Sequence, residues 1–307
     1  MMNANHALGI DLGGTKTYAV LLDGAGRTVW DRRVATPSRD YGATIAMLAG
    51  LVDAARAVVP GQTLSVGIGG PGSLTPAGLM KNANTMVLNG RPVLQDIETA
   101  IGQPARFAND ANCLALSEAT DGAGAGRDVV FAVILGTGTG AGIAVHGRVL
   151  SGPNGLAGEW GHNPLPWAVA GEDPAWDCYC GQRGCNETLL CGLGIARDHA
   201  AVTGQDLPAQ QIATRAAEGD AACAATLERH ASRLARALAG VINVLDPDVI
   251  VLGGGLSLMP HLVERVPALW SRWVFSGGHR DPVRTELRQS LHGDASGVRG
   301  AAWLWRS

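Results

Sequence analysis

Apolar and polar positions follow two different periods along this chain, and together they predict alternating strands and helices. Short apolar runs bounded by glycine are typical of buried strands, whereas apolar residues spaced three or four apart predict helices. Strands are expected over residues 8–12, 17–22, 28–34, 64–68, 105–108, 129–135, 143–145, 249–252 and 287–291. Helices are expected over residues 41–58, 92–102, 111–119, 189–200, 221–245 and 297–305, and another is expected to begin at Pro260, because proline suits the first helical turn.

One supersecondary unit occurs twice. A strand, a Gly/Thr turn, a second strand and a hairpin run from Leu8 to Val34, and the same series restarts at Val129 and ends near Arg148. Repetition of such a unit is typical of a duplicated architecture. We therefore predict an α/β protein of two lobes, residues 1–122 joined by a C-terminal helix over 295–307, and a larger lobe over 123–294. The cleft between the lobes is the expected ligand site.

A segment rich in metal-binding side chains, residues 159–187, interrupts the second lobe as an insertion. Gly181 and Gly184 allow tight turns, so that the thiolates can converge on one ion. Four protein ligands leave no open position, which predicts a structural zinc rather than a catalytic one. The alternative is a loop with buried or disulfide-bonded cysteines. Glu159 and Glu187 bracket the cluster, so it is expected to support a polar binding site. The expected zinc ligands are His162, Cys178, Cys180 and Cys185.

Three glycine-rich turns follow predicted strands and suit a nucleotide. The first offers backbone N–H groups, threonine hydroxyls and the charge of Lys16 to a triphosphate, and Asp11 can hold Mg²⁺ through water. The second turn repeats these donors without the acid, and the third permits close approach of a base or ribose. Each alone is equally compatible with an ordinary tight turn, but three together predict nucleotide binding. The assigned residues are Gly9, Asp11, Gly13, Gly14, Thr15, Lys16, Thr17, Gly136, Thr137, Gly138, Gly254 and Gly255.

Asn109 and Asp110 end a predicted strand, where open α/β sheets present ligand-contacting residues. Asp110 is the candidate general base, because its carboxylate can accept a proton from an attacking hydroxyl during phosphoryl transfer. The alternative is that Asp110 caps the following helix, a position that aspartate favours. Both roles can hold together.

Composition narrows the class of protein. The chain has 307 residues, of which 46% are hydrophobic and 17% charged, an ordinary globular composition. A net charge of −3 argues against nucleic acid or an anionic membrane surface as a partner. We see no signal peptide, because the N-terminus reaches a strand-like run by Ala7 with no basic n-region or apolar h-region. We see no membrane span, because threonines and glycines break the most apolar stretch, and we expect a cytoplasmic protein. Cys113, Cys191 and Cys223 are expected to be reduced and buried.

The nucleotide, base and zinc stretches together resemble the ROK family of bacterial sugar kinases and sugar-responsive repressors. The resemblance extends from Leu8 to Ala302 and implies an actin-like, ribonuclease-H-like two-domain ATPase fold. The stretches that carry it are Asp11-Leu12-Gly13-Gly14-Thr15-Lys16, Asn109-Asp110-Ala111-Asn112, Gly136-Thr137-Gly138, residues 159–162, and Cys178-x-Cys180-Gly181-x-x-Gly184-Cys185-x-Glu187.

The resemblance also implies residue roles. Asp110 would be the base and His162 would use its second ring nitrogen on a sugar oxygen while the first binds zinc. The expected ligands are a hexose and MgATP, and we expect a homodimer. The residues assigned to the sugar are Gly72, Asn84, Asn109, Asp110, Glu159, His162 and Glu187.

Within the family, residues 36–41, 81–90 and 159–167 resemble bacterial fructokinases of the manno(fructo)kinase type. We therefore expect ATP-dependent phosphorylation of D-fructose at its 6-hydroxyl, with mannose as a secondary substrate. Gly70 departs from the isoleucine common in relatives. An N-acetylglucosamine or glucose kinase is the alternative. A sugar-sensing repressor is a remote alternative, because only a few residues precede Leu8 and no basic recognition helix is visible.

Overall fold

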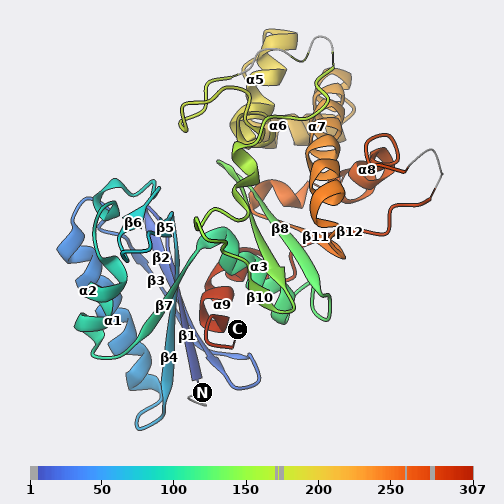
Figure 1. The fold of residues 1–307 in the computed structure, drawn as a ribbon. Coiled ribbons are helices and arrows are strands. Elements are labelled where there is room, and N and C mark those ends of the chain that lie inside the picture. Colours follow the sequence, from blue (N-terminus) through green and yellow to red (C-terminus); the bar gives the residue numbers. More distant parts are fainter. Residues whose placement is uncertain (1–5, 170–171, 173–175, 260, 277–280, 307) are drawn as a thin grey trace. The chain divides into compact units, whose positions relative to one another are not determined.

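The computed structural model describes residues 6–169, 172, 176–259, 261–276 and 281–306. Contacts divide the chain into two compact units (Figure 1). The first unit comprises Met1–Gly126, Gly142–Ala157 and Leu291–Ser307, and the second comprises Arg127–Ala141 and Gly158–Ser290. The sequence analysis placed residues 142–157 in the second lobe. They group with the first unit, where Gly142 lies directly against the backbone of Ala111.

The first unit is built on a five-stranded sheet in the order β3-β2-β1-β4-β7. The strands β1, β2 and β3 form an antiparallel meander, and β1, β4 and β7 run parallel. All five were expected from the apolar runs. Their bounds are β1 His6–Leu12, β2 Lys16–Asp23, β3 Thr28–Ala35, β4 Leu64–Gly70 and β7 Ala105–Asn109.

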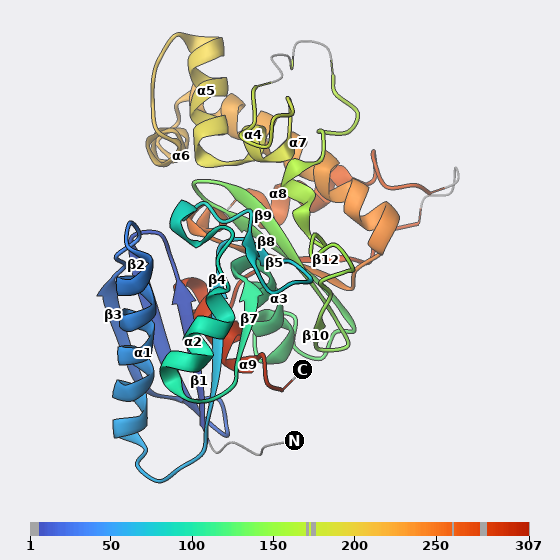
Figure 2. The ribbon, with the colours of Figure 1, turned by 60° about the vertical axis from the view of Figure 1, so that its left-hand side comes forward.

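Helices cover both faces of this sheet, with α1 and α2 on one face and α3 and α9 on the other (Figures 1 and 2). Pleat alternation sends Leu8 and Ile10 into the core beneath α1 and α2, while Gly9 faces α9. A Cβ atom on Gly9 would lie 1.9 Å from the Val298 carbonyl oxygen, so glycine lets α9 approach the sheet closely. The helices span α1 Tyr41–Val58, α2 Val93–Ile101, α3 Asp110–Thr120 and α9 Ser296–Trp303.

The second five-stranded sheet has the order β10-β9-β8-β11-β12, which repeats the order of the first sheet. Again a hairpin meander leads, and β8, β11 and β12 run parallel. The duplicated unit predicted from the sequence is thereby confirmed. The strands are β8 Val129–Leu135, β9 Thr139–Val145, β10 Arg148–Val149, β11 Val249–Gly253 and β12 Glu286–Gln289.

Five α-helices are described in the second unit, and α4–α7 pack together (Figure 2). The single helix expected over 189–200 is two helices, because the backbone of Cys191 is extended between them. The sequence analysis did not predict α6, whose buried face consists only of Ala209 and Ile212. The predicted start at Pro260 lies outside the described residues. The bounds are α4 Asn186–Leu190, α5 Gly192–Thr203, α6 Ala209–Ala217, α7 Ala221–Leu245 and α8 His261–Trp270.

Short elements complete the chain. They are β5 Ser73–Leu74, β6 Met80–Lys81, η1 Met86–Leu88, η2 Glu159–His162, η3 Gly255–Leu258 and η4 Gly293–Ala295.

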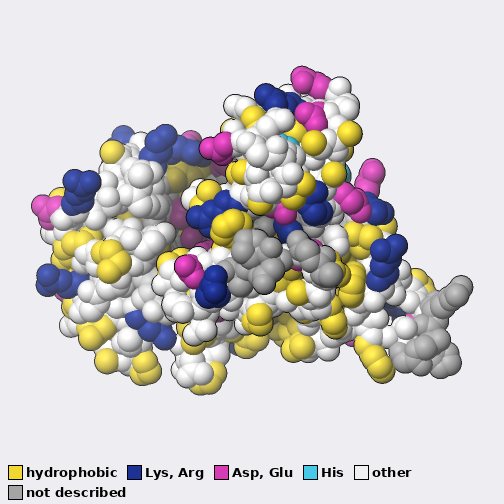
Figure 3. Space-filling view, turned by 90° about the horizontal axis from the view of Figure 1, so that it is seen from above, with side chains coloured by type: hydrophobic (Ala, Val, Ile, Leu, Met, Phe, Trp, Pro, Cys, Tyr) yellow, Lys and Arg dark blue, Asp and Glu magenta, His cyan; other side chains and the backbone are white. Residues whose placement is uncertain are grey.

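Among the described helices, α1 is long and apolar enough to cross a membrane by length and composition. Leu48, Leu51 and Val52 nevertheless bury its apolar face in the hydrophobic core of the first unit. On the face seen in Figure 3, basic and acidic side chains are scattered among neutral and hydrophobic ones.

Candidate active site

The parallel strands of the first sheet bring three predicted site segments to one edge. Asp11 on β1 pairs in register with Gly69 on β4, and Gly70 pairs with Asn109 on β7. Because these strands run parallel, Asp11, the turn after β4 and the Asn109–Asp110 pair all lie at the carboxyl ends. Ligand-contacting residues gather at this edge in open α/β sheets.

The helix cap that the sequence analysis offered as an alternative role for Asp110 belongs to Asn109. Asn109 is the N-cap of α3, because its side-chain oxygen accepts the Ala111 N–H at 2.9 Å. Its amide nitrogen donates to the Gly72 carbonyl at 3.3 Å. Asp110 is the first helical residue, is exposed, and also accepts the Ala111 N–H, at 2.8 Å. The cap is therefore Asn109, and Asp110 keeps an accessible carboxylate at the helix N-terminus.

Asp11 lies on the α9 side of the sheet, where its Oδ2 would be 3.5 Å from a Cβ atom on Gly297. Burial and, to a smaller extent, the nearby charge of Asp110 raise the pKa of Asp11 to about 6, against a smaller opposing effect of Arg33. Arg33 stands across the meander from this carboxylate, since Asp11 pairs with Tyr18 and Tyr18 with Arg33, and its guanidinium lies over the Tyr18 ring. The sequence analysis missed Arg33, which only the strand register identifies.

The first Gly/Thr turn presents Gly14, Thr15 and Lys16 to solvent. Gly13 is needed for the turn itself, because a Cβ there would lie 2.6 Å from the Lys16 carbonyl oxygen. Thr17 differs from expectation, because it is buried and its hydroxyl is 2.8 Å from that of Thr36. That hydroxyl is not an open phosphate donor. Gly9, also assigned to the nucleotide, is accounted for by the packing of α9.

Gly72 and Asn84 lie in the segment that follows β4. Gly72 has a φ of 78°, and a Cβ atom there would lie 2.3 Å from the Lys81 carbonyl oxygen, so its identity follows from conformation and packing. Its carbonyl also receives the Asn109 amide. Asn84 is exposed and accepts a long hydrogen bond from Thr85 at 3.4 Å. These contacts leave the Asn84 side chain accessible to a ligand.

In the second unit, the glycine-rich turns meet at the carboxyl edge of β8 and β11. Gly254 has a φ of 80° and packs against Leu135, the last residue of β8, whereas Thr137 and Gly255 are exposed. A Cβ atom on Gly138 would lie 3.1 Å from a carboxylate oxygen of Glu187. The second Gly/Thr turn therefore contacts a residue assigned to the sugar, a proximity that their separation in sequence did not suggest.

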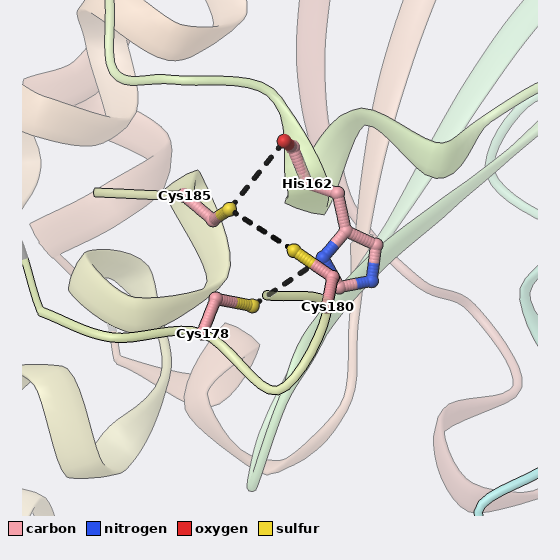
Figure 4. A group of neighbouring side chains, drawn as sticks. All are labelled: His162, Cys178, Cys180 and Cys185. Carbon is pink, nitrogen blue, oxygen red and sulfur yellow. Dashed lines mark hydrogen bonds between the residues drawn. The ribbon is translucent and has the colours of Figure 1, made fainter. Parts of the chain in front are cut away.

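The four predicted zinc ligands converge, as Figure 4 shows. Their ligand atoms all lie within 4.8 Å of one another. The Sγ atoms of Cys180 and Cys185 are 3.7 Å apart, and Cys178 Sγ is 3.5 Å from His162 Nδ1. A tetrahedral zinc with ordinary bond lengths requires edges of about 3.75 Å between sulfurs and about 3.55 Å between sulfur and nitrogen. The two measured edges match such a zinc site, and Nδ1 is the ring nitrogen of His162 that faces the Cys178 thiol.

The cluster is anchored to the second unit at both ends. The Trp160 ring in η2 is buried, packs edge-on against Phe131 of β8, and donates Nε1–H to the Ala237 carbonyl at 3.2 Å. Asn186, directly after the last cysteine, donates to the Trp160 carbonyl at 3.1 Å. Between these ends, the Glu172 carboxylate forms an ion pair with the fully buried Arg236 of α7. Glu159 precedes the cluster in the sequence and Glu187 follows it. These contacts hold both residues within the second unit.

His162 directs its second ring nitrogen away from the cysteines. Nε2 lies 4.0 Å from a Glu159 oxygen and 3.0 Å from the Tyr179 hydroxyl. Burial raises the pKa of Glu187, while the Thr139 N–H and His162 oppose that effect. The Tyr179 hydroxyl lies at His162 Nε2, and its ring meets the imidazole edge-on. Tyr179 therefore belongs to this polar group. The sequence analysis missed it, although its place between two ligand cysteines was a usable signal.

The duplicated sheets, with glycine-rich turns at their carboxyl edges, define the actin-like, ribonuclease-H-like ATPase fold. The ROK family profile matches residues 7–307. The N-acetyl-D-glucosamine kinase of Pasteurella multocida is 38% identical, over 97% of this chain and 99% of that protein. The chain therefore belongs to the ROK family.

Solved structures agree with this assignment. A ROK hexokinase from Thermus thermophilus superposes with a TM-score of 0.82 at 29% identity, covering 97% of both chains. A ROK family glucokinase from Streptomyces griseus, in complex with glucose and AMPPNP, gives a TM-score of 0.77 at 26% identity, covering 97% of this chain and 98% of the other.

Proposed function

We propose that this protein is an ATP-dependent hexose kinase that phosphorylates N-acetyl-D-glucosamine at its 6-hydroxyl. The observation that carries the sugar assignment is the 38% identity, over nearly the whole of both chains, to an N-acetyl-D-glucosamine kinase. The sequence analysis ranked this sugar as the alternative and D-fructose first. The relatives support the alternative better, and the stretches that suggested fructose cover only a small part of the chain.

In the first unit, Asp110 is proposed to accept the proton of the attacking hydroxyl. Its carboxylate is exposed at the start of α3, and the Asn109 cap fixes the backbone on which it stands. Mg²⁺, when bound with ATP, would neutralise charge on the transferring phosphoryl group. Asp11 is the residue proposed to hold that ion through water, and Gly14, Thr15 and Lys16 are proposed to contact the phosphates. Asp11 is at the same strand edge as Asp110.

In the second unit, Glu159, His162 and Glu187 are proposed to bind sugar hydroxyls. Their positions depend on the cluster of three cysteines and His162, whose geometry fits one structural zinc. If Nδ1 of His162 holds a zinc ion, Nε2 would carry the ring proton and would donate outward. The turn from Gly136 to Gly138 is proposed to contact the nucleotide.

D-Fructose remains a second candidate, favoured by the stretch 159–167, which contains two of the proposed sugar ligands. A coupled ADP-release assay with N-acetyl-D-glucosamine, fructose, mannose and glucose separates the two. We expect kcat/KM to be highest for N-acetyl-D-glucosamine. Highest kcat/KM for fructose would reverse the ranking, and no transfer to any hexose would overturn the proposed function.

A further inference from the structure

Tyr179 makes a contact that competes with the proposed sugar site. Its hydroxyl lies 3.0 Å from Nε2 of His162, and its ring meets the imidazole edge-on with centroids 5.1 Å apart. Nε2 is the atom that faces away from the cysteine cluster, since Nδ1 points toward Cys178. A sugar oxygen bound by His162 needs the same nitrogen. The phenol hydroxyl and the sugar hydroxyl are chemically equivalent as partners of an N–H donor.

Hydrogen bonds fix the backbone around Tyr179, whereas among the described residues its hydroxyl and ring contacts are with His162. The Cys178 N–H donates to the Gln182 carbonyl at 2.9 Å, and the Gly181 N–H donates to the Cys178 carbonyl at 3.0 Å. The residue therefore stands at the tip of a closed turn. The Tyr179 residue is 81% exposed, so rotating it away from His162 buries or uncovers little apolar surface. Such a side chain can leave the imidazole without disturbing the turn.

We propose that Tyr179 is an affinity-determining residue of the sugar site, whose hydroxyl occupies His162 Nε2 in the sugar-free protein and leaves when a sugar hydroxyl takes its place. This inference rests on the proposed function, because it assigns Nε2 to the sugar. The hydrogen bond between Tyr179 and His162 lowers the fraction of protein that is ready to bind sugar, and it therefore raises the apparent dissociation constant for sugar. It also keeps the Nε2 proton directed outward, which fixes the tautomer that zinc at Nδ1 requires.

The test is Tyr179→Phe, which retains the ring and removes the hydroxyl. The net worth of one hydrogen bond sets the expected gain, so KM for the preferred sugar should fall about 2- to 10-fold, with kcat and KM for MgATP unchanged. Tyr41→Phe is the matched control, because it removes a hydroxyl that donates to Asp96 in the first unit. That variant should leave KM for the sugar unaltered. Zinc content should be the same in all three proteins.

A second measurement does not depend on turnover. The Nε2–H resonance of His162, seen by ¹H–¹⁵N NMR, should shift in the wild type when saturating sugar is added. In Tyr179→Phe without sugar it should already be displaced or broadened by exchange with water. An unchanged or raised KM for sugar in Tyr179→Phe overturns the proposal, as does an imidazole resonance that is insensitive to the substitution.

Failure of the proposed kinase function can be distinguished from failure of the proposal for Tyr179. If the wild type transfers phosphate to no hexose, the kinase assignment fails, and calorimetric binding of sugar together with the imidazole resonance then decides the role of Tyr179. Tighter sugar binding by Tyr179→Phe in that case supports the displacement of Tyr179. Absence of hexose binding to both proteins overturns the displacement along with the kinase assignment.

Discussion

The two five-stranded sheets share one strand order but differ in the chemistry at their matching turns. After β1, the turn is accompanied by an acid within the strand, Asp11, and by Lys16. After β8, the strand supplies no acid, and the carboxylate beside the turn is Glu187 of α4, which follows the cysteine cluster in the chain. The scaffold was duplicated, but each copy receives its carboxylate by a different route.

This difference accompanies a long segment between β10 and β11, which includes the cysteine cluster and α4–α7. A carboxylate from outside the sheet must be held by something other than the strand hydrogen bonds. The cysteine cluster, the buried Trp160 and the ion pair between Glu172 and Arg236 provide that support. In the first unit the strand register alone positions Asp11 beside the turn.

The largest expected effect is a loss of kcat from a change at the carboxyl edge of the first sheet, where α3 begins. Asp110→Asn should lower kcat by about two to four orders of magnitude, because a positioned base is typically worth that much. The fold should persist, since the asparagine oxygen can still accept the Ala111 N–H. Steady-state kinetics check this, with Asp220→Asn at the N-cap of α7 as the control that keeps full activity. Turnover of the Asp110 variant within a few-fold of wild type would reduce Asp110 to a structural residue.

Changes to the cysteine cluster beside the second sheet should mainly alter KM for sugar. Cys180→Ser is expected to lower the zinc content from about one per chain and to raise KM for sugar about 10- to 100-fold, because a lost ligand loosens the supports of Glu187 and His162. KM for MgATP should rise less, although the contact between Glu187 and Gly138 makes some change expected.

Metal analysis and calorimetry measure both quantities. Cys223→Ala, which removes a buried thiol from α7, should retain the zinc. A zinc-free wild-type protein with full activity would contradict the structural role of the metal.

The two Gly/Thr turns can be compared directly with added methyl groups. Gly14 has its nearest neighbour 3.6 Å from an ideal Cβ, and Gly136 has none within 4 Å among the described residues. Alanine therefore fits both positions, and a change in KM for MgATP would report a nearby phosphate. We expect a rise of about tenfold for each, the worth of one charge-assisted hydrogen bond. Gly50→Ala in α1, also in open space, is the control, and unchanged kinetics in either turn variant would remove that turn from the nucleotide site.

The last prediction concerns the free energy of unfolding and its dependence on pH, and the expected effect vanishes at low pH. The pKa of Asp11, about 6, lies above its ordinary 3.8, so the native protein holds this proton more tightly than the unfolded chain does. Ionised Asp11 therefore destabilises the ligand-free protein above pH 6, and the penalty fades as the pH falls from 6 toward 3.8. Asp11→Asn should add at most about 3 kcal/mol to the free energy of unfolding at pH 8 and nothing near pH 3.5.

Urea unfolding at the two pH values measures this difference in the absence of MgATP. The same variant should use MgATP poorly, which separates stability from function. A gain in stability that is equal at both pH values would show that the ionised carboxylate is not its source.

Local patterns in the sequence determined much of the fold. The predicted helices over residues 41–58 and 221–245 match α1 and α7 in their bounds, because long apolar periodicity and the N-caps Asp40 and Asp220 act between near neighbours. The duplicated strand–turn–strand unit was equally visible. The convergence of His162 with the three cysteines followed from ligand spacing and the glycines between them. These features depend on residues that are close in the chain.

Tertiary structure decided the features that depend on distant partners. The burial of Thr17 against Thr36, the fit of Gly9 beneath α9 and the contact of Glu187 with Gly138 all join segments that the chain pattern does not connect. The extended backbone at Cys191 divides one apolar stretch into two helices. A glycine suits a phosphate and a closely packed helix equally well in the sequence, because both need only the absence of Cβ. The identity of the neighbour distinguishes them, and folding alone places it there.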